Sequence, residues 1–491
     1  MGVTSAYASP WVQVGQAQLR SDIEVLAAAG VIDNITTQWP LPWGGILYRL
    51  DQPGALRGQP TYVVAAAERV RRQGMAATQT HELRTSFTVD ATNAPAVVRG
   101  VDAMGLQDVQ SQVNVEYQWE STVVHLAVGA QTTSRNYLWN SNAVNAVPGR
   151  RRTGHRDNQI LLLDGSYIAQ RVGNAAIYAG YLTHWWGPGW ISALSLSNNA
   201  RPFPQIGISR IDTTPFRSPW FSWLGPWQAE FFIGVLDGPR IARNTLFNGL
   251  RVAFNPLPGL ELALARTEEL CGTGHPCKPV AEFFNVYNDN KHPSKSKDET
   301  NFDVRYTGRL RDLSYSFYLQ VMDRDTGPFV HSFSSHLFGA SVWIPVRSTS
   351  IRVTAEYADT ISTLNFFSFG KDVYGITYTD YKYIEGWQYR DRTLGSSLDS
   401  DSRLASLQAS WIGPHDITYT LTYHHAAIGS LQSPGTNIVT ATPVTINIGE
   451  ARVRIPLSWG AIEVAGRLQD DQPRPDKGFQ AAIETGLTIN L

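Results

Sequence analysis

Apolar and polar side chains alternate with a period of two from about residue 82 to the end of the chain. The alternation is clearest in 113–119, 351–357, 405–411 and 417–423. Successive side chains of a β-strand point to opposite faces, so each segment would have one apolar and one polar face. An amphipathic sheet of a soluble protein shows the same alternation. Its repetition without intervening helical patterns favours an all-β architecture, a transmembrane antiparallel β-barrel.

Short and long connections alternate along the second half of the chain. Short turns are expected near 311–312, 347–349, 379–380, 413–415 and 457–459, and long polar loops near 324–336, 359–371, 390–402, 425–443 and 470–477. Outer-membrane barrels have short periplasmic turns and longer outer loops. This order predicts that the last strand, 478–491, ends in the periplasm and that 184–202 and 267–301 lie outside. A strand missed upstream would reverse the last two assignments, and the pattern gives about 18 to 20 strands.

The first part of the chain has a helical pattern instead. Leu19, Ile23 and Leu26 are spaced for one helix face within 16–29, and Gly30 would end that helix. A second helix is expected from Pro60 to Arg72, with Gly74 beyond it, and 39–45 would be an irregular proline-rich link. These patterns predict a small helical subdomain over 9–80, on the periplasmic side of a barrel formed by 81–491.

The N-terminus suggests export. Ala6, Tyr7 and Ala8 resemble the small-x-small end of a signal peptide, although the charged and apolar regions of such a leader are missing. Residues 1–8 are therefore expected to be a leader remnant or a cloning scar. A chance occurrence in an irregular terminus would give the same pattern.

Cys271 and Cys277 are the only cysteines, and Gly and Pro lie between them. A tight loop of this kind can close through a disulfide in an oxidising compartment, which predicts a Cys271–Cys277 bond. The alternative takes both cysteines and His275 as zinc ligands, but no fourth ligand is evident nearby, so no metal is expected.

Composition agrees with a chain that has little surface in water. Hydrophobic residues make up 43% and charged residues 17%, below the usual quarter or so. The 15 Trp, 20 Tyr and 19 Phe would suffice for aromatic girdles at two membrane interfaces. The formal net charge is -1, so nothing indicates a nucleic-acid partner.

Several strings resemble Wzi-type capsule assembly proteins. They are 19–23, 27–32 and 37–43 near the N-terminus, 185–190 with 196–202 in the middle, and 389–392, 395 and 397–403 later. The double-tryptophan string 185–190 is the most specific of these. The resemblance implies an outer-membrane barrel of about 18 strands with a short helical bundle near its periplasmic mouth. It also implies a lectin-like role in attaching capsular polysaccharide to the cell surface.

Two groups of residues are candidates for holding such a glycan. Aromatic rings can stack on sugar faces while amides and guanidinium groups bind hydroxyls, which suggests Trp185, Trp186, Trp190, Asn198, Asn199 and Arg201. The alternative is that the tryptophans anchor the membrane interface or pack inside the lumen. The second group, Asp399, Asp401 and Arg403, could meet a charged polysaccharide or form a network of mutually satisfied charges. A calcium loop is disfavoured because Arg403 occupies the next ligand position.

Enzyme signatures are missing from the chain. It contains no G-x-S-x-G, H-E-x-x-H, G-x-x-x-x-G-K-[ST] or G-x-G-x-x-G string, so no catalytic residue and no cofactor is expected. The sequence therefore predicts a binding protein rather than an enzyme. It would be a monomer in the cell outer membrane, with outer-membrane lipid and capsular polysaccharide or exopolysaccharide as partners. The alternatives are a porin for sugars and an enzyme that modifies surface glycans.

Overall fold

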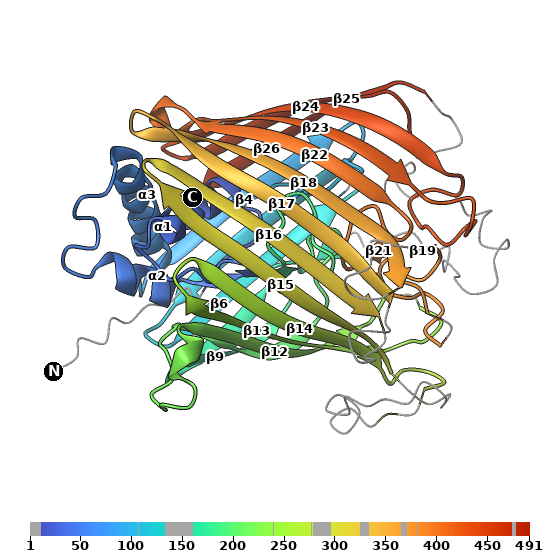
Figure 1. Ribbon diagram of the computed structural model, residues 1–491, viewed down its shortest axis with the longest axis horizontal. Coiled ribbons are helices and arrows are strands. Elements are labelled where there is room, and N and C mark those ends of the chain that lie inside the picture. The colour runs from blue at the N-terminus through green and yellow to red at the C-terminus, as the bar shows by residue number, and fades with distance from the viewer. Residues whose placement is uncertain are drawn as a thin grey trace.

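A computed structural model describes residues 11–106, 108–132, 161–238, 240–275, 277, 296–324, 333–364, 371–380, 382–473 and 478–491. The expectation for residues 1–8 lies outside these ranges. Twenty of the described strands form one closed antiparallel barrel, with helices at one end (Figure 1). Of the twenty strands in this sheet, β7 (Leu161–Leu162) and β19 (Asp372–Val373) pair only with β6 and β18. Subtracting these two leaves eighteen strands in the complete ring, which confirms the predicted fold.

The eighteen strands have the following bounds: β4 (Leu83–Thr92), β5 (Val109–Gln118), β6 (Thr122–Gln131), β8 (Tyr167–Val172), β9 (Ala175–Gly180), β11 (Gln205–Arg210), β12 (Trp227–Leu236), β13 (Thr245–Leu257), β14 (Leu260–Leu270), β15 (Lys297–Leu310), β16 (Leu313–Arg324), β17 (Phe333–Val346), β18 (Thr349–Leu364), β22 (Arg403–Ile412), β23 (Thr418–Ile428), β24 (Val444–Leu457), β25 (Gly460–Gln469) and β26 (Gln480–Asn490). Each pairs with its neighbours in the ring, and β26 pairs with β4 to close it.

The alternation predicted from the sequence separates two faces of the wall. In β14, Leu264 is 48% exposed and points outward, whereas Glu261 and Ala263 are buried in the lumen. The same holds in β15, where Tyr306 is exposed and Arg305 is buried. The barrel therefore has an apolar outside and a polar, charged inside.

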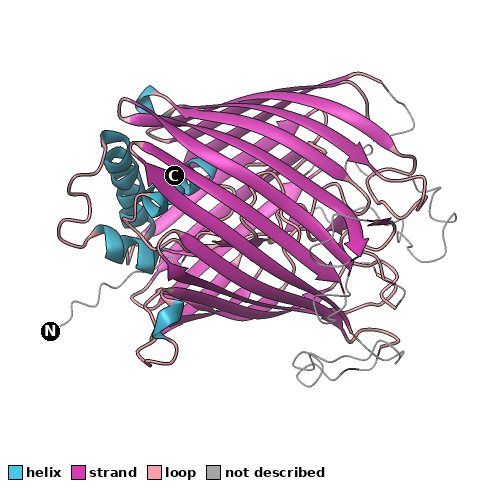
Figure 2. Cartoon of the chain, in the orientation of Figure 1, coloured by secondary structure: helices cyan, strands magenta, loops and turns pink. Residues whose placement is uncertain are grey.

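Three helices lie at one end of the barrel, shown in cyan at the left of Figure 2. They are α1 (Ala17–Ala28), α2 (Trp43–Leu50) and α3 (Thr61–Ala77), and the one-turn helices η2 (Ser222–Leu224) and η3 (Pro414–Asp416) lie in turns between strands. No helix in the described ranges is long and apolar enough to cross a membrane. We call this end, which also carries the short turns at 311–312, 347–348 and 458–459, the bundle end, and the opposite end the loop end.

Two details of the helical region differ from the prediction. The 39–45 link is not irregular throughout, because α2 begins at Trp43 and buries Ile46 and Leu47. Gly74 does not follow the second helix but lies inside α3, where an added Cβ would be 2.7 Å from a methyl carbon of Leu47 and 3.0 Å from the Trp43 ring. Tertiary packing of α2 on α3 outweighs the weak helix propensity of glycine here.

The turn predicted at 379–380 is also not a turn between barrel strands. Residues 365–402 form a single connection between β18 and β22, and Asp380 instead accepts backbone N–H groups of Lys382 and Tyr383 in a local turn. This false turn adds two strands to the predicted count. Because two is an even number, the predicted side of each loop earlier in the chain does not change.

Two connections from the loop end fold into the lumen. Residues 181–204 carry β10 (Trp185–Trp186), which pairs with β2 (Gln38–Trp39), and 374–402 carry β20 (Gln388–Tyr389) paired with β21 (Arg392–Thr393). The remaining short strands, β1 (Trp11–Val12) and β3 (Leu41–Pro42), pair with each other. The segment 184–202, expected as an outer loop, is thus buried within the barrel.

Candidate functional site

The double-tryptophan string lies at the centre of the lumen. Trp185 pairs with Trp39 across β10 and β2, and Trp185, Trp186 and Trp190 are each at most 1% exposed. Gly187 allows the chain to pass close to the wall, since a Cβ there would lie 2.7 Å from the Gln320 amide, and its φ of 148° favours glycine. The three rings therefore pack inside the lumen rather than at the membrane interface.

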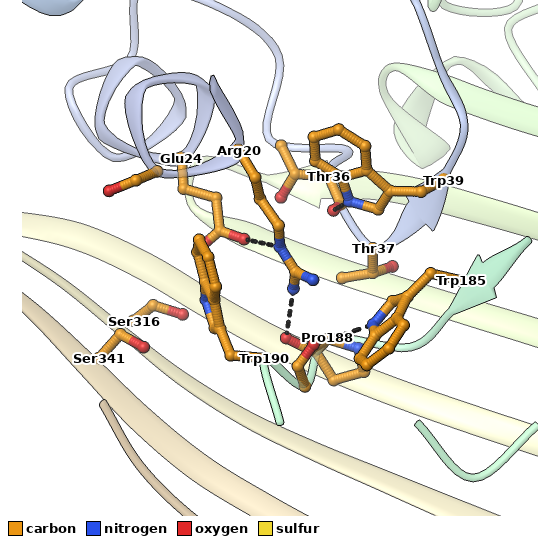
Figure 3. A network of polar contacts seen from close by, with 12 residues as sticks. Arg20, Glu24, Thr36, Thr37, Trp39, Trp185, Pro188, Trp190, Ser316 and Ser341 are labelled. Carbon is orange, nitrogen blue, oxygen red and sulfur yellow. Dashed lines mark hydrogen bonds and ion pairs between the residues drawn. The ribbon is translucent and has the colours of Figure 1, made fainter. Parts of the chain in front are cut away.

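Arg20 of α1 joins the helical bundle to this string, as Figure 3 shows. Its guanidinium donates to the Glu24 carboxylate at 2.9 Å and to the Pro188 carbonyl oxygen at 2.9 Å. It also lies 4.3 Å from the Trp190 ring centroid, and the Trp190 indole N–H donates to Glu24 at 3.3 Å. A charged helix residue is thus held by an ion pair, a carbonyl oxygen and an aromatic face.

Glu356 of β18 fixes the same segment to the barrel wall. Its carboxylate accepts the backbone N–H groups of Trp190 and Ser192, each at 2.7 Å, and of Ile191 at 3.2 Å. Tyr318 donates to it from the neighbouring part of the wall at 2.9 Å. Four donors on one buried carboxylate make this connection a rigid plug rather than a loose loop.

Asn198, Asn199 and Arg201 are engaged within the protein as well. The Asn198 amide donates to the Gly100 carbonyl oxygen at 3.0 Å, and that of Asn199 to Thr393 at 2.9 Å. Arg201 makes a bidentate pair with Asp164, both contacts at 2.8 Å. Their role as glycan contacts stays a prediction, since these donors already have protein acceptors.

Asp399 and Asp401 accept hydrogen bonds that hold the second connection in the lumen, residues 374–402, in place. Thr393 donates to Asp399 at 2.6 Å, and the backbone N–H of Ile438 donates to it at 2.9 Å. Asp401 accepts hydrogen bonds from Ser433, Thr436 and the Gly375 N–H. Burial raises the pKa of the Asp401 carboxyl, and these hydrogen bonds offset part of that rise. Both residues are at most 1% exposed, so they hold loops together inside the barrel.

Arg403 is the member of the second group that reaches the surface. Its side chain is 41% exposed and pairs with Asp359 at 2.9 Å and Asp372 at 2.8 Å. Asp372 also accepts the Tyr374 hydroxyl at 3.1 Å. An exposed guanidinium beside carboxylates and a tyrosine offers the mixed donors and acceptors that sugar hydroxyls require.

A second partly exposed cluster lies at the same end, on the connection after β12. Asp237 is 42% exposed and lies 3.6 Å from Arg390, and it accepts the Tyr389 hydroxyl. The Arg390 guanidinium lies 5.2 Å from the Tyr389 ring centroid. We call these two clusters together the rim; its partly exposed side chains are those of Asp237, Asp372, Tyr374, Arg390 and Arg403, and the buried Tyr389 supports them. Sequence analysis missed Asp237, Asp372 and Tyr374. The only sequence signal for Asp237 is a polar residue directly after the ten-residue strand β12, whereas Asp372 and Tyr374 lie at the two-residue strand β19 and have no such signal.

A disulfide joins Cys271 and Cys277, with an S–S distance of 1.99 Å, in the connection after β14. His275, the third ligand of the zinc alternative, stacks on Tyr383 with 4.3 Å between ring centroids. Within the described ranges, no group of three or more His, Cys, Asp or Glu side chains is arranged to hold a metal ion.

Comparison with known proteins adds a family and a shared fold. The model of the family "Capsule assembly protein Wzi" matches residues 71–472. A relative from Klebsiella pneumoniae, described as an uncharacterized 55.8 kDa protein in the cps region, is 23% identical over 344 residues. That match covers 68% of this chain and 62% of the relative, so the chain spans less than two thirds of the relative's length.

The structural match covers nearly the whole chain. It is to Wzi of Escherichia coli, described as an outer membrane protein involved in group 1 capsule assembly and as a carbohydrate-binding β-barrel. The TM-score is 0.80 at 18% sequence identity, with 97% of this chain and 98% of the other covered. The two chains therefore share a fold.

Proposed function

Because this chain belongs to the Wzi family of capsule assembly proteins, we propose that it is a lectin-like barrel of the cell outer membrane that attaches capsular polysaccharide or exopolysaccharide to the cell surface. The family match over 71–472 is the observation that carries this proposal. The carbohydrate binding described for the E. coli protein of the same fold supports it.

The outer face of the barrel supports a place in a lipid bilayer. Large apolar side chains are exposed all round the wall, which a water-soluble barrel would not tolerate. Aromatic residues lie next to the short turns at the bundle end, as in the girdle of an outer-membrane barrel: Trp119, Trp411, Tyr419 and Trp459. Lipid is thus one proposed partner, and we propose that the barrel acts as a monomer.

The contents of the lumen favour binding over conduction. The connection 181–204, called the Trp190 segment below, is bound to the wall through Glu356 and to α1 through Arg20. Within it, Leu194 donates its N–H to Gln320 at 2.9 Å. A porin needs a water-filled passage, whereas these segments cross the middle of the barrel and bury their side chains there. We therefore place glycan contacts at the rim, where polar side chains reach the surface.

Catalysis is not part of the proposal. The chain carries none of the nucleophile, metal or nucleotide motifs sought in its sequence, and the family is one of capsule assembly. Incubating the purified protein with capsule and measuring chain length and acetyl content tests this point. Unchanged polysaccharide is expected, and shortened or deacetylated chains would establish an enzyme instead.

A deletion strain tests the attachment role directly. Complementation with the full chain should shift capsule from the medium to the cells, measured as the ratio of cell-bound to released polysaccharide. The double variant Arg390→Ala/Arg403→Ala should lower that ratio, since it removes two rim cations. Arg347→Ala is the matched control, because this exposed arginine lies on the β17–β18 turn at the bundle end. An unchanged ratio on deletion of the protein would refute attachment.

A further inference from the structure

A polar cavity of about 510 Å³ lies at the bundle end, between the N-terminus of α1 and the inner wall formed by β18 and β22–β25. None of its lining residues belongs to the rim or to the glycan candidates found in the sequence. The volume lies within the range of small-molecule sites, about 300 to 1,000 Å³. The cavity therefore has room for one or two sugar units at the end opposite the rim.

Arg352 of β18 is a buried cation that lines this cavity. Its side chain donates to Thr354 at 2.8 Å and to Gln408 at 2.7 Å, both neutral acceptors, and its guanidinium lies 3.5 Å from the Trp190 ring centroid. Among the described residues it makes no ion pair with a carboxylate within 4.0 Å, and its Nε has no acceptor. Asp102 and Glu24 attract it only from farther away. Burying a charge without an opposite charge is costly, so the site favours an anion.

The acidic groups of the cavity are already bound to other arginines. Asp416 pairs with Arg72 at 2.9 Å. Glu463 pairs with Arg452 at 3.1 Å, and Asp102 lies 3.9 Å from the same guanidinium. These pairs leave the positive charge of Arg352 without a direct partner.

Arg454, an exposed cation of β24, lies on the same wall. It lines the cavity near Thr418, whose hydroxyl donates to Gln18 at 3.1 Å, and it makes no ion pair or hydrogen bond with the described residues. Two guanidinium groups are thus available to one bound group.

The N-terminus of α1 opens into the same space. Gln16, its N-cap residue, makes no capping hydrogen bond, and the first turn contains no acidic residue. The backbone N–H groups of Gln18 and Leu19 have no acceptor among the described residues. Unsatisfied N–H groups and the positive end of the helix dipole favour an anion at this position.

We propose that this cavity, between Arg352, Arg454 and the N-terminus of α1, binds the carboxylate of an acidic sugar. The two guanidinium groups and the helix N–H groups hold the carboxylate, and the hydroxyl and amide groups of Ser410, Thr420 and Gln73 face the sugar hydroxyls. The cavity and its charged residues follow from the structure alone. That the carboxylate belongs to a sugar rests on the proposed function.

The test is a titration of the full chain, purified in detergent at low ionic strength, with glucuronate, glucose and inorganic phosphate. Calorimetry or saturation-transfer NMR should detect glucuronate binding and no binding of glucose. Arg454→Gln should weaken glucuronate binding by about tenfold or more, since a charge-assisted contact is lost. Arg454 is exposed, so this variant should fold even where the buried Arg352→Gln does not. Arg347→Gln, at the same end but outside the cavity, should bind as the unaltered chain does.

Equal binding of glucose, equal affinity in Arg454→Gln, or binding of phosphate without glucuronate would overturn the proposal. The two proposals also fail separately. If the chain binds glucuronate through Arg454 but does not retain capsule, attachment is wrong and the cavity stands. If it retains capsule but does not bind glucuronate, the cavity proposal alone is wrong.

Discussion

Trp190 illustrates how one side chain can connect three parts of a barrel. Its ring contacts two guanidinium groups, those of Arg20 and Arg352, at 4.3 Å and 3.5 Å from the ring centroid. Its backbone N–H is bound by Glu356 and its indole N–H by Glu24. The residue thus links α1, β18 and the lumen insert, and packing explains its position without a glycan.

We expect Trp190→Ala to lower the free energy of unfolding by about 3 to 5 kcal/mol, the usual cost of removing a buried tryptophan ring. Denaturant unfolding of the purified protein in detergent measures this loss. Leu431→Ala is the control, because Leu431 is 79% exposed in the connection after β23, and we expect a change within about 0.5 kcal/mol. If Trp190→Ala kept full stability and lost only glycan retention, the ring would be a glycan contact after all.

At the scale of single residues, the sequence singled out the double-tryptophan string 185–190 but not the residues that contact it. Tryptophans near Gly187 and Asn198 suit a sugar site and a packed plug equally well, because both need rings and amides. Which of the two occurs depends on contacts with Arg20 and Glu356, more than 160 residues away in the chain. Period-two patterns carry no information on such pairings.

At the scale of elements, strands were easier to predict than helices. Each strand has many neighbours that obey the same alternation, whereas α2 is eight residues long and contains Gly44 and Gly45. Its stability comes from packing on α3, which no local pattern displays. The same packing explains why Gly74 lies within a helix rather than after it.

The contact at Gly74 gives a prediction for the bundle. Gly74→Val should destabilise the packing of α2 on α3 by about 1 to 3 kcal/mol, because its side chain would overlap Leu47 and Trp43. Hydrogen exchange of α2 and α3 should then become faster while the barrel strands stay protected. Ala76→Val, at an exposed position of the same helix, should leave exchange in α2 unchanged. Equal exchange in both variants would contradict the close packing.

The connection between β11 and β12 is unusual among those at the bundle end. It carries Trp220, Phe221 and Trp223, which are 83%, 53% and 66% exposed. Behind them, Phe216 stacks on Trp227 with 4.4 Å between ring centroids. Exposed indole rings on a membrane barrel prefer the interface between headgroups and acyl chains.

We therefore expect a fluorophore on Trp220→Cys to be quenched by brominated lipids in proteoliposomes. The same label on Gln52→Cys, an exposed position in the connection after α2, should instead be quenched by iodide in the buffer. Quenching of the label at position 220 by iodide alone would mean that this aromatic loop projects into water.

For the whole molecule, the filled lumen predicts electrical behaviour. Planar bilayers containing the protein should show little steady conductance, because the Trp190 segment and the 374–402 connection cross the middle of the barrel. Weakening the plug with Glu356→Ala, which removes the acceptor of three backbone N–H groups, should raise the frequency of open events. A large, stable open level in the unaltered protein would favour the porin alternative.

The pairing of β26 with β4 has a consequence for biosynthesis. The ring closes through residues 484–490 of β26 and 86–92 of β4, so β25 and β4 keep unpaired edges until the last strand is inserted. A polypeptide released early, before residue 480, would expose two unsatisfied strand edges, so truncated products should be degraded rather than persist as partly active proteins.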